Sequence, residues 1–104
     1  MARFDVYQHP DPAIRKKTPY LLDVQNSHID RIGTRVVIPL RLAEYFALRM
    51  RDLNPSFEIG GKAVVLDTAA MAAIPVAELK KPVVNVAAQS ASVMAALDVV
   101  FGAY

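Results

Sequence analysis

The chain has 104 residues, with 12 Lys and Arg against 10 Asp and Glu, which gives a formal net charge of +2 at pH 7. Apolar residues make up 54% of it, so a single domain over residues 1–104 is expected and wholesale disorder is excluded. The absence of Cys excludes disulfide frameworks, thiolate metal sites and Cys nucleophiles, and two surplus positive charges are too few for a general nucleic-acid surface.

The first half of the chain predicts three strands and one helix. Residues 3–7 alternate in polarity, residues 20–25 are rich in Leu and Val, and residues 34–40 are β-branched up to a proline. Residues 42–53 place apolar side chains between charged ones, which favours a helix that Asn54-Pro55 would end.

The second half predicts a hairpin and a terminal helix. Residues 57–59 and 62–67 flank Gly60-Gly61 as the two strands of the hairpin, and residues 69–76 form another short apolar segment. Good helix formers predict a helix over residues 86–101. One face of that helix is expected to carry the larger apolar residues Val86, Val93, Leu97, Val100 and Phe101, and roughly opposite lie Ala91, Ala95 and Val99. Five or more short strands with a terminal helix indicate a small, mostly antiparallel barrel.

No signal peptide is expected, because Arg3 and Asp5 stand where an apolar region would begin. The most apolar stretch, residues 83–104, is interrupted by Asn, Gln and Ser, so we expect no membrane association.

Catalytic and metal-binding patterns are sparse. His9 and His28 are far apart in predicted turns and have no carboxylates at ligand spacing, so we expect no metal, no cofactor and no catalytic residue. One enzymatic alternative stays open, which is acid–base cleavage of RNA by convergence of four residues. These are His28, Asp30, Arg31 and Arg35.

The positive charge lies in the first half of the chain. Residues 1–52 hold nine Lys and Arg against six Asp and Glu, whereas residues 53–104 hold three against four. The excess is either a solvated surface or a patch for an anionic partner.

The order of several short motifs resembles the CcdB toxin family. The motifs are Phe4-Asp5-Val6-Tyr7, Leu22-Asp23-Val24-Gln25-Asn26, Arg35-Val36-Val37-Ile38-Pro39-Leu40, Leu53-Asn54-Pro55, Ile59-Gly60 and Met71-Ala72-Ala73-Ile74-Pro75-Val76. A terminal helix ending at Phe101 completes a resemblance that covers nearly the whole chain.

The resemblance implies a mostly β, SH3-like small barrel with a small three-stranded antiparallel wing and a C-terminal helix. It also implies an irregular, partly strand-like segment after Leu40, against the helix expected there from composition. The implied function is that of a cytoplasmic, non-enzymatic, homodimeric toxin of a type II toxin–antitoxin module that poisons DNA gyrase through its A subunit. A cognate antitoxin with an acidic disordered tail would neutralise it, and the pair would repress its own operon, so that DNA is contacted only through the antitoxin complex.

The resemblance also implies two gyrase-binding regions. One is the loop at His28 and Ile29, and the other comprises the helix end and C-terminus at Asp98, Phe101, Gly102, Ala103 and Tyr104. The chain departs from the family's Phe-Trp-Gly-Ile ending, because it ends in Phe-Gly-Ala-Tyr and has no Trp.

Two alternatives to gyrase poisoning therefore stay open. One is a degenerate homologue that keeps its dimer and antitoxin but does not inhibit gyrase, and the other is a ribonuclease toxin of the related MazF/Kid type.

Overall fold

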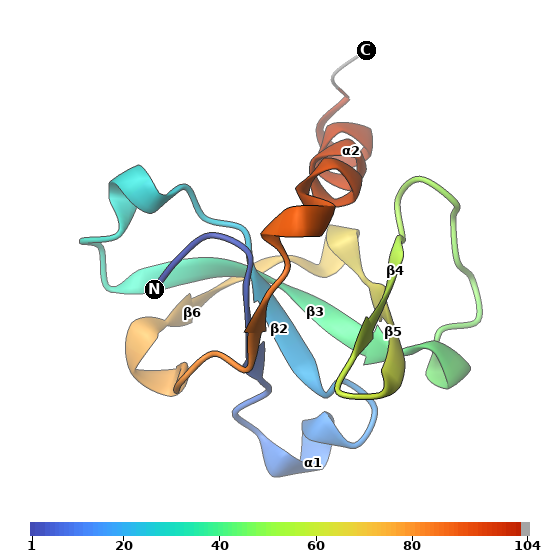
Figure 1. Cartoon of the computed structure of the whole chain (residues 1–104), viewed down its shortest axis with the longest axis horizontal. Coiled ribbons are helices and arrows are strands. Elements are labelled where there is room, and N and C mark those ends of the chain that lie inside the picture. The colour runs from blue at the N-terminus through green and yellow to red at the C-terminus, as the bar shows by residue number, and fades with distance from the viewer. Residues whose placement is uncertain (103–104) are drawn as a thin grey trace.

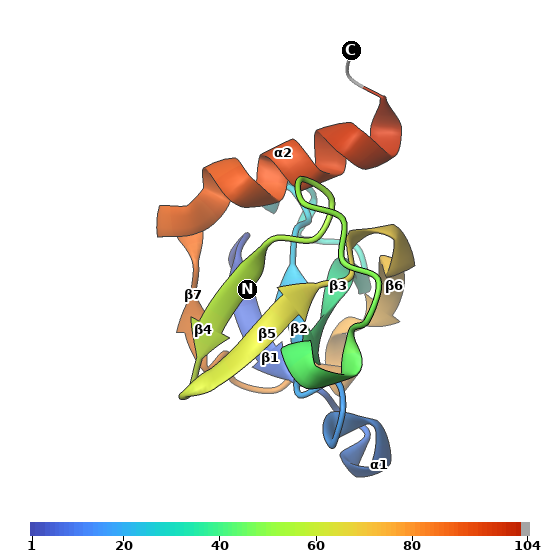
Figure 2. The ribbon, with the colours of Figure 1, turned by 90° about the vertical axis from the view of Figure 1, so that its right-hand side faces the viewer.

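The computed structural model describes residues 1–102 (Figure 1). A seven-stranded antiparallel sheet curls into a nearly closed barrel, with helix α2 across one end and the single-turn helix α1 at the other (Figures 1 and 2). The strands are β1 (Asp5–Gln8), β2 (Tyr20–Asp23), β3 (Thr34–Leu42), β4 (Ser56–Ile59), β5 (Lys62–Leu66), β6 (Ala72–Pro75) and β7 (Val84–Asn85). The helices are α1 (Pro12–Arg15) and α2 (Ser90–Phe101), with 3-10 turns η1 (Ser27–Ile29), η2 (Ala43–Tyr45), η3 (Thr68–Ala70), η4 (Val76–Glu78) and η5 (Ala87–Gln89).

Strand β3 organises the sheet, whose order is β4-β5-β3-β2-β1-β7 with β6 paired to β3. The first part of β3 pairs with β6, its middle with β2 and its last residues with β5. Strands β3, β5 and β4 thus form a three-stranded antiparallel unit, continuous with the rest of the sheet. The mostly β barrel with a C-terminal helix is confirmed.

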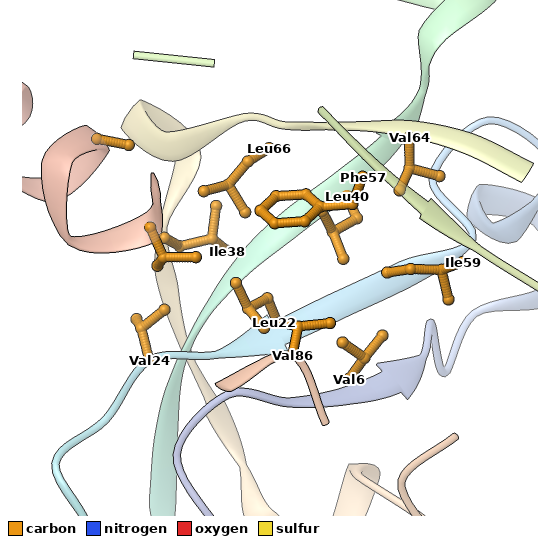
Figure 3. Packing of buried hydrophobic residues seen from close by; sticks show 12 residues of the cluster. Val6, Leu22, Val24, Ile38, Leu40, Phe57, Ile59, Val64, Leu66 and Val86 are labelled. Carbon is orange, nitrogen blue, oxygen red and sulfur yellow. The ribbon is translucent and has the colours of Figure 1, made fainter. Parts of the chain in front are cut away.

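The main core fills the barrel beneath α2 (Figure 3). Val6, Leu22, Ile38 and Leu40, from three neighbouring strands, are at most 1% exposed in it. Branched aliphatic side chains suit such a position because they pack well against a pleated surface. Burial of this cluster holds α2 on the barrel, since Val93 and Ala96 of the helix belong to it.

The predicted hairpin is confirmed. Gly60 and Gly61 have φ angles of 58° and 76°, which is the left-handed conformation that both central residues of a type I′ turn require. A Cβ on Gly60 would lie 2.7 Å from the Tyr20 hydroxyl, so that position also lacks room for a side chain.

The helix predicted over residues 42–53 is wrong. Strand β3 continues to Leu42, which pairs with Val64 of β5, and the turn η2 follows. The side chain of Asn54 then fixes the rest of the segment, because it accepts from Met50 N and donates to Leu66 O. Leu48 is 89% exposed and Met50 60%, so the apolar side chains in the middle of this segment face no core, and strand pairing at Leu42 overrides helix propensity.

Two smaller expectations also need correction, and one helix was not expected. The predicted alternation in residues 3–7 is absent, because Asp5, Val6 and Tyr7 are all buried in a strand covered on both faces. The helix α2 begins at Ser90 instead of Val86, since β7 and η5 occupy the preceding residues. The helix α1 was not expected, although Asp11 before Pro12 is a capping signal and its side chain accepts from Ala13 N.

Candidate protein-binding site

Helix α2 uses only a narrow stripe of its surface to pack on the barrel. Val93 and Ala96, three positions apart, are fully buried, and Leu97 packs beside them. Ala91 and Ala95 are exposed, and Met94 is 37% exposed. The helix therefore presents a surface of small and apolar residues that the barrel does not cover.

The C-terminal end of α2 displays an aromatic ring. Phe101 is 71% exposed, although it shares a helical face with Val93, which is fully buried. The helix is capped by Gly102, which has the left-handed conformation with φ of 67°. The N–H of Gly102 donates to the carbonyl oxygen of the exposed Asp98 at 2.8 Å. Ala103 and Tyr104 lie outside the described residues.

The second region expected to bind gyrase is the turn η1. The side chain of Asn26 accepts from His28 N at 2.9 Å, and Ile29 N donates to Asn26 O. The cap leaves the side chain of His28 exposed and that of Ile29 51% exposed. A loop of this kind presents side chains to a partner at little cost, since its backbone is already ordered.

Gln25 anchors this turn from below and was not singled out in the sequence. It is 3% exposed, its Nε2 donates to Ile29 O at 2.8 Å, and its Oε1 accepts from Val36 N at 3.0 Å. One amide thus ties the turn to strand β3. The sequence signal that could have identified Gln25 is Asp23-Val24-Gln25, in which two polar residues flank an apolar one in a predicted strand. If such a strand is buried, its polar side chains must find hydrogen-bond partners within the fold.

A buried ion pair lies next to Gln25. Arg35 donates from Nε to Asp23 Oδ2 at 2.7 Å and from Nη2 to Asp23 Oδ1 at 3.0 Å, and both side chains are fully buried. The Nη1 atom of Arg35 has no hydrogen-bond partner within residues 1–102. The convergence of Arg35 with His28, Asp30 and Arg31, which the RNA-cleavage alternative requires, is not found, because Arg35 is buried and the other three residues are exposed on the surface loop.

Arg3 connects the two regions. Its Nε donates to the carbonyl of Val24, directly before the loop, and its Nη2 lies 3.2 Å from the sulfur of Met94 on α2. The guanidinium also stacks over Phe4, at 5.0 Å from the ring centroid. Through Arg3 the end of strand β2 and helix α2 are held at the same end of the molecule.

Two of the arginines in the first half of the chain are already neutralised. Besides Arg35, Arg41 pairs with Asp67 at 2.6 Å and donates to Thr18. These are the ion pairs within residues 1–102, so Arg31 and Arg51, which are exposed, remain available to an anionic partner. The same residues contain no group of three or more His, Asp or Glu placed to hold a metal ion, and no helix long and apolar enough to cross a bilayer.

Comparison with known families identifies a match over nearly the whole chain. The family model CcdB, described as CcdB protein, matches residues 3–102. The matched region contains the barrel, the turn η1 and the whole of α2.

Proposed function

The chain belongs to the CcdB family, the toxins of toxin–antitoxin modules, and on this premise we propose that it binds and poisons the A subunit of DNA gyrase. The observation that carries the proposal is Phe101, a large aromatic that is 71% exposed at the end of a packed helix. An aromatic in that position contributes little to the core, whereas aromatic anchors dominate the energetics of many protein interfaces.

The proposed gyrase-binding surface joins the helix end with the turn η1. Asp98, Phe101 and Gly102 would contact gyrase from the helix, together with Ala103 and Tyr104, and His28 with Ile29 from the turn. The family's Trp is missing, so Phe101 is the anchor of this surface and Tyr104 supplies a second ring. Binding to gyrase would account for the toxicity, and the protein itself would catalyse no reaction.

We also propose that the protein is a homodimer in the cytoplasm. The uncovered surface of α2 supports this, because exposed Ala91 and Ala95 let the backbone of another chain approach closely. The cognate antitoxin would neutralise the toxin with an acidic disordered tail, for which Arg31 and Arg51 offer exposed, unpaired charges. The complex of toxin and antitoxin would repress the operon, and the toxin would contact DNA only through this complex.

The decisive experiment adds purified protein to gyrase and supercoiled plasmid and measures trapped cleaved DNA. The wild-type chain is expected to give linear DNA, and Phe101→Ala is expected to weaken binding to the A subunit by roughly 30-fold, corresponding to a lost anchor of about 2 kcal/mol. Leu48→Ala is the matched control, because it also removes an exposed apolar side chain, but from the segment between β3 and β4, outside the proposed gyrase-binding surface.

The same assay tests the degenerate homologue, which the absence of Trp supports. A chain that binds its antitoxin tightly but neither binds gyrase nor traps cleaved DNA would establish that reading and refute gyrase poisoning. Equal losses for Phe101→Ala and Leu48→Ala would refute the proposed anchor.

A further inference from the structure

A second candidate site lies at the end of the molecule that carries α1, opposite α2 (Figures 1 and 2). A cavity of about 240 Å³ opens there between the residues that follow β1 and the segment that leads into β7. Its lining includes one histidine, one acidic and three basic side chains, which are His9, Glu78, Arg15, Lys80 and Lys81. None of these residues belongs to the proposed gyrase-binding surface.

The cations of this cavity are not neutralised within the fold. Arg15, Lys80 and Lys81 take part in neither of the two ion pairs formed among residues 1–102. With Glu78 as the one carboxylate in the lining, the cavity carries an excess of two positive charges. Like charges gathered in a recess create a positive potential, and an anion that enters it is attracted more strongly than at a flat surface.

Arg15 is held in position to bind. Its Nε donates to the carbonyl oxygen of His9 at 2.9 Å, and in the described part of the chain its terminal nitrogens make no hydrogen bond. His9 is also oriented, because its Nδ1 accepts from Asp11 N at 3.1 Å. The neutral imidazole therefore carries its proton on Nε2, which leaves a donor for a ligand.

We propose that this cavity binds a phosphate group. An oriented guanidinium suits the paired oxygens of a phosphate, two lysines add point charges, and the histidine adds a further donor. The volume is below the range of about 300–1,000 Å³ that is usual for larger ligands, so the site fits one phosphate with a small substituent. The group belongs either to a soluble phosphate ester or to the backbone of a nucleic acid.

His9 provides a built-in reporter of binding. Burial lowers its pKa below 6.5, and the charges of Arg15 and Arg41 lower it further against the opposing effect of Asp11 and Glu78. A bound phosphate would offset the cations and raise the pKa of His9. The exposed His28, on the turn at the other end of the barrel, serves as an internal reference.

The test is an NMR titration of the two histidine rings with inorganic phosphate at constant ionic strength, with acetate as the matched anion. We expect saturable shifts and a raised pKa at His9, with His28 unchanged. Replacing Lys80 and Lys81 together by Gln is expected to weaken phosphate binding about tenfold or more. Both lysines are exposed, so folding is not at risk, and Lys62→Gln on β5 is the control.

Two further ligands distinguish the source of the phosphate. Tighter binding of a nucleoside 5′-monophosphate supports the site and assigns a soluble ester to it, whereas tighter binding of a short DNA duplex supports it and assigns the backbone. The proposal is overturned if His9 and His28 shift together without saturation, if acetate matches phosphate, or if the Lys80 and Lys81 replacement has no effect. An acidic peptide that binds more tightly than every phosphate probe would also overturn it.

Discussion

The sheet of β1, β2 and β3 is buried on both faces, and the two faces are built from different chemistry. Leu22 and Asp23 are neighbours on β2 and point to opposite faces, and each is fully buried. Leu22 belongs to the apolar core under α2, where its partners are aliphatic or aromatic. Asp23 lies on the face with Tyr7 and Arg35, where apolar packing surrounds a buried ion pair.

The difference shows how one strand satisfies two requirements. Apolar packing is non-directional, so the first face provides stability with little demand on exact geometry. An ion pair with fixed hydrogen bonds demands a particular arrangement, because an unpaired buried charge is costly. The second face lies next to Gln25 and the turn η1, so the demanding arrangement is found where the proposed binding loop must be held.

Removing the carboxylate should have the largest effect. Asp23→Ala leaves the guanidinium of Arg35 buried without a partner, and we expect the free energy of unfolding to fall by roughly 3 to 5 kcal/mol. Urea denaturation measures this loss. The control replaces both residues, Asp23→Leu with Arg35→Met, which should recover most of the stability; a double variant as unstable as the single one would contradict the explanation.

A cavity in the apolar core should lower the free energy of unfolding somewhat less than the loss of the Asp23 carboxylate. Leu22→Ala removes a fully buried side chain from the apolar core and is expected to lower the free energy of unfolding by about 3 kcal/mol. The same denaturation experiment applies, repeated with Leu22→Met as a control of similar volume. A loss for Leu22→Ala below about 1 kcal/mol would mean that this core collapses around the substitution.

Alkaline pH should destabilise the protein through Tyr7 on the polar face. Burial, followed by the negative charges of Asp5 and Asp23, raises the pKa of Tyr7 to about 12. Below pH 10 the phenol is protonated in both states, but between pH 10 and 12 the unfolded chain ionises first, so stability falls by roughly 2 to 3 kcal/mol. Denaturation at pH 9 and 11 measures the slope. Tyr7→Phe should remove that part of it, and an unchanged slope would refute the assignment.

The smallest expected effect concerns the loop. Gln25→Ala removes both hydrogen bonds of the side chain amide and is expected to cost about 1 to 2 kcal/mol. If Gln25 supports the turn specifically, the variant should show faster amide hydrogen exchange at residues 26–29 with little change in α2. Asn26→Ala, which removes the exposed cap, is the companion variant. Uniform acceleration throughout the barrel would show that Gln25 supports the whole fold instead of the turn.

Local patterns specify much of this molecule. The Gly60-Gly61 turn, the β-branched run of β3 and the good helix formers of α2 each determine their element through backbone preference or side-chain shape. The order of short motifs was enough to identify the family, which the match over residues 3–102 shows. The resemblance also named Phe101 and His28 as gyrase-binding residues, and both side chains are exposed.

Tertiary structure decided what local patterns could not. Residues 42–53 have helical propensity, but Leu42 pairs with Val64 and Leu48 has nothing to pack against, so the helix does not form. Nothing in the sequence distinguishes Arg35 from the exposed Arg31, and only the fold places Arg35 beside Asp23 in the interior. Propensity and composition report what a residue prefers by itself, whereas burial and charge pairing depend on partners that are distant in the chain.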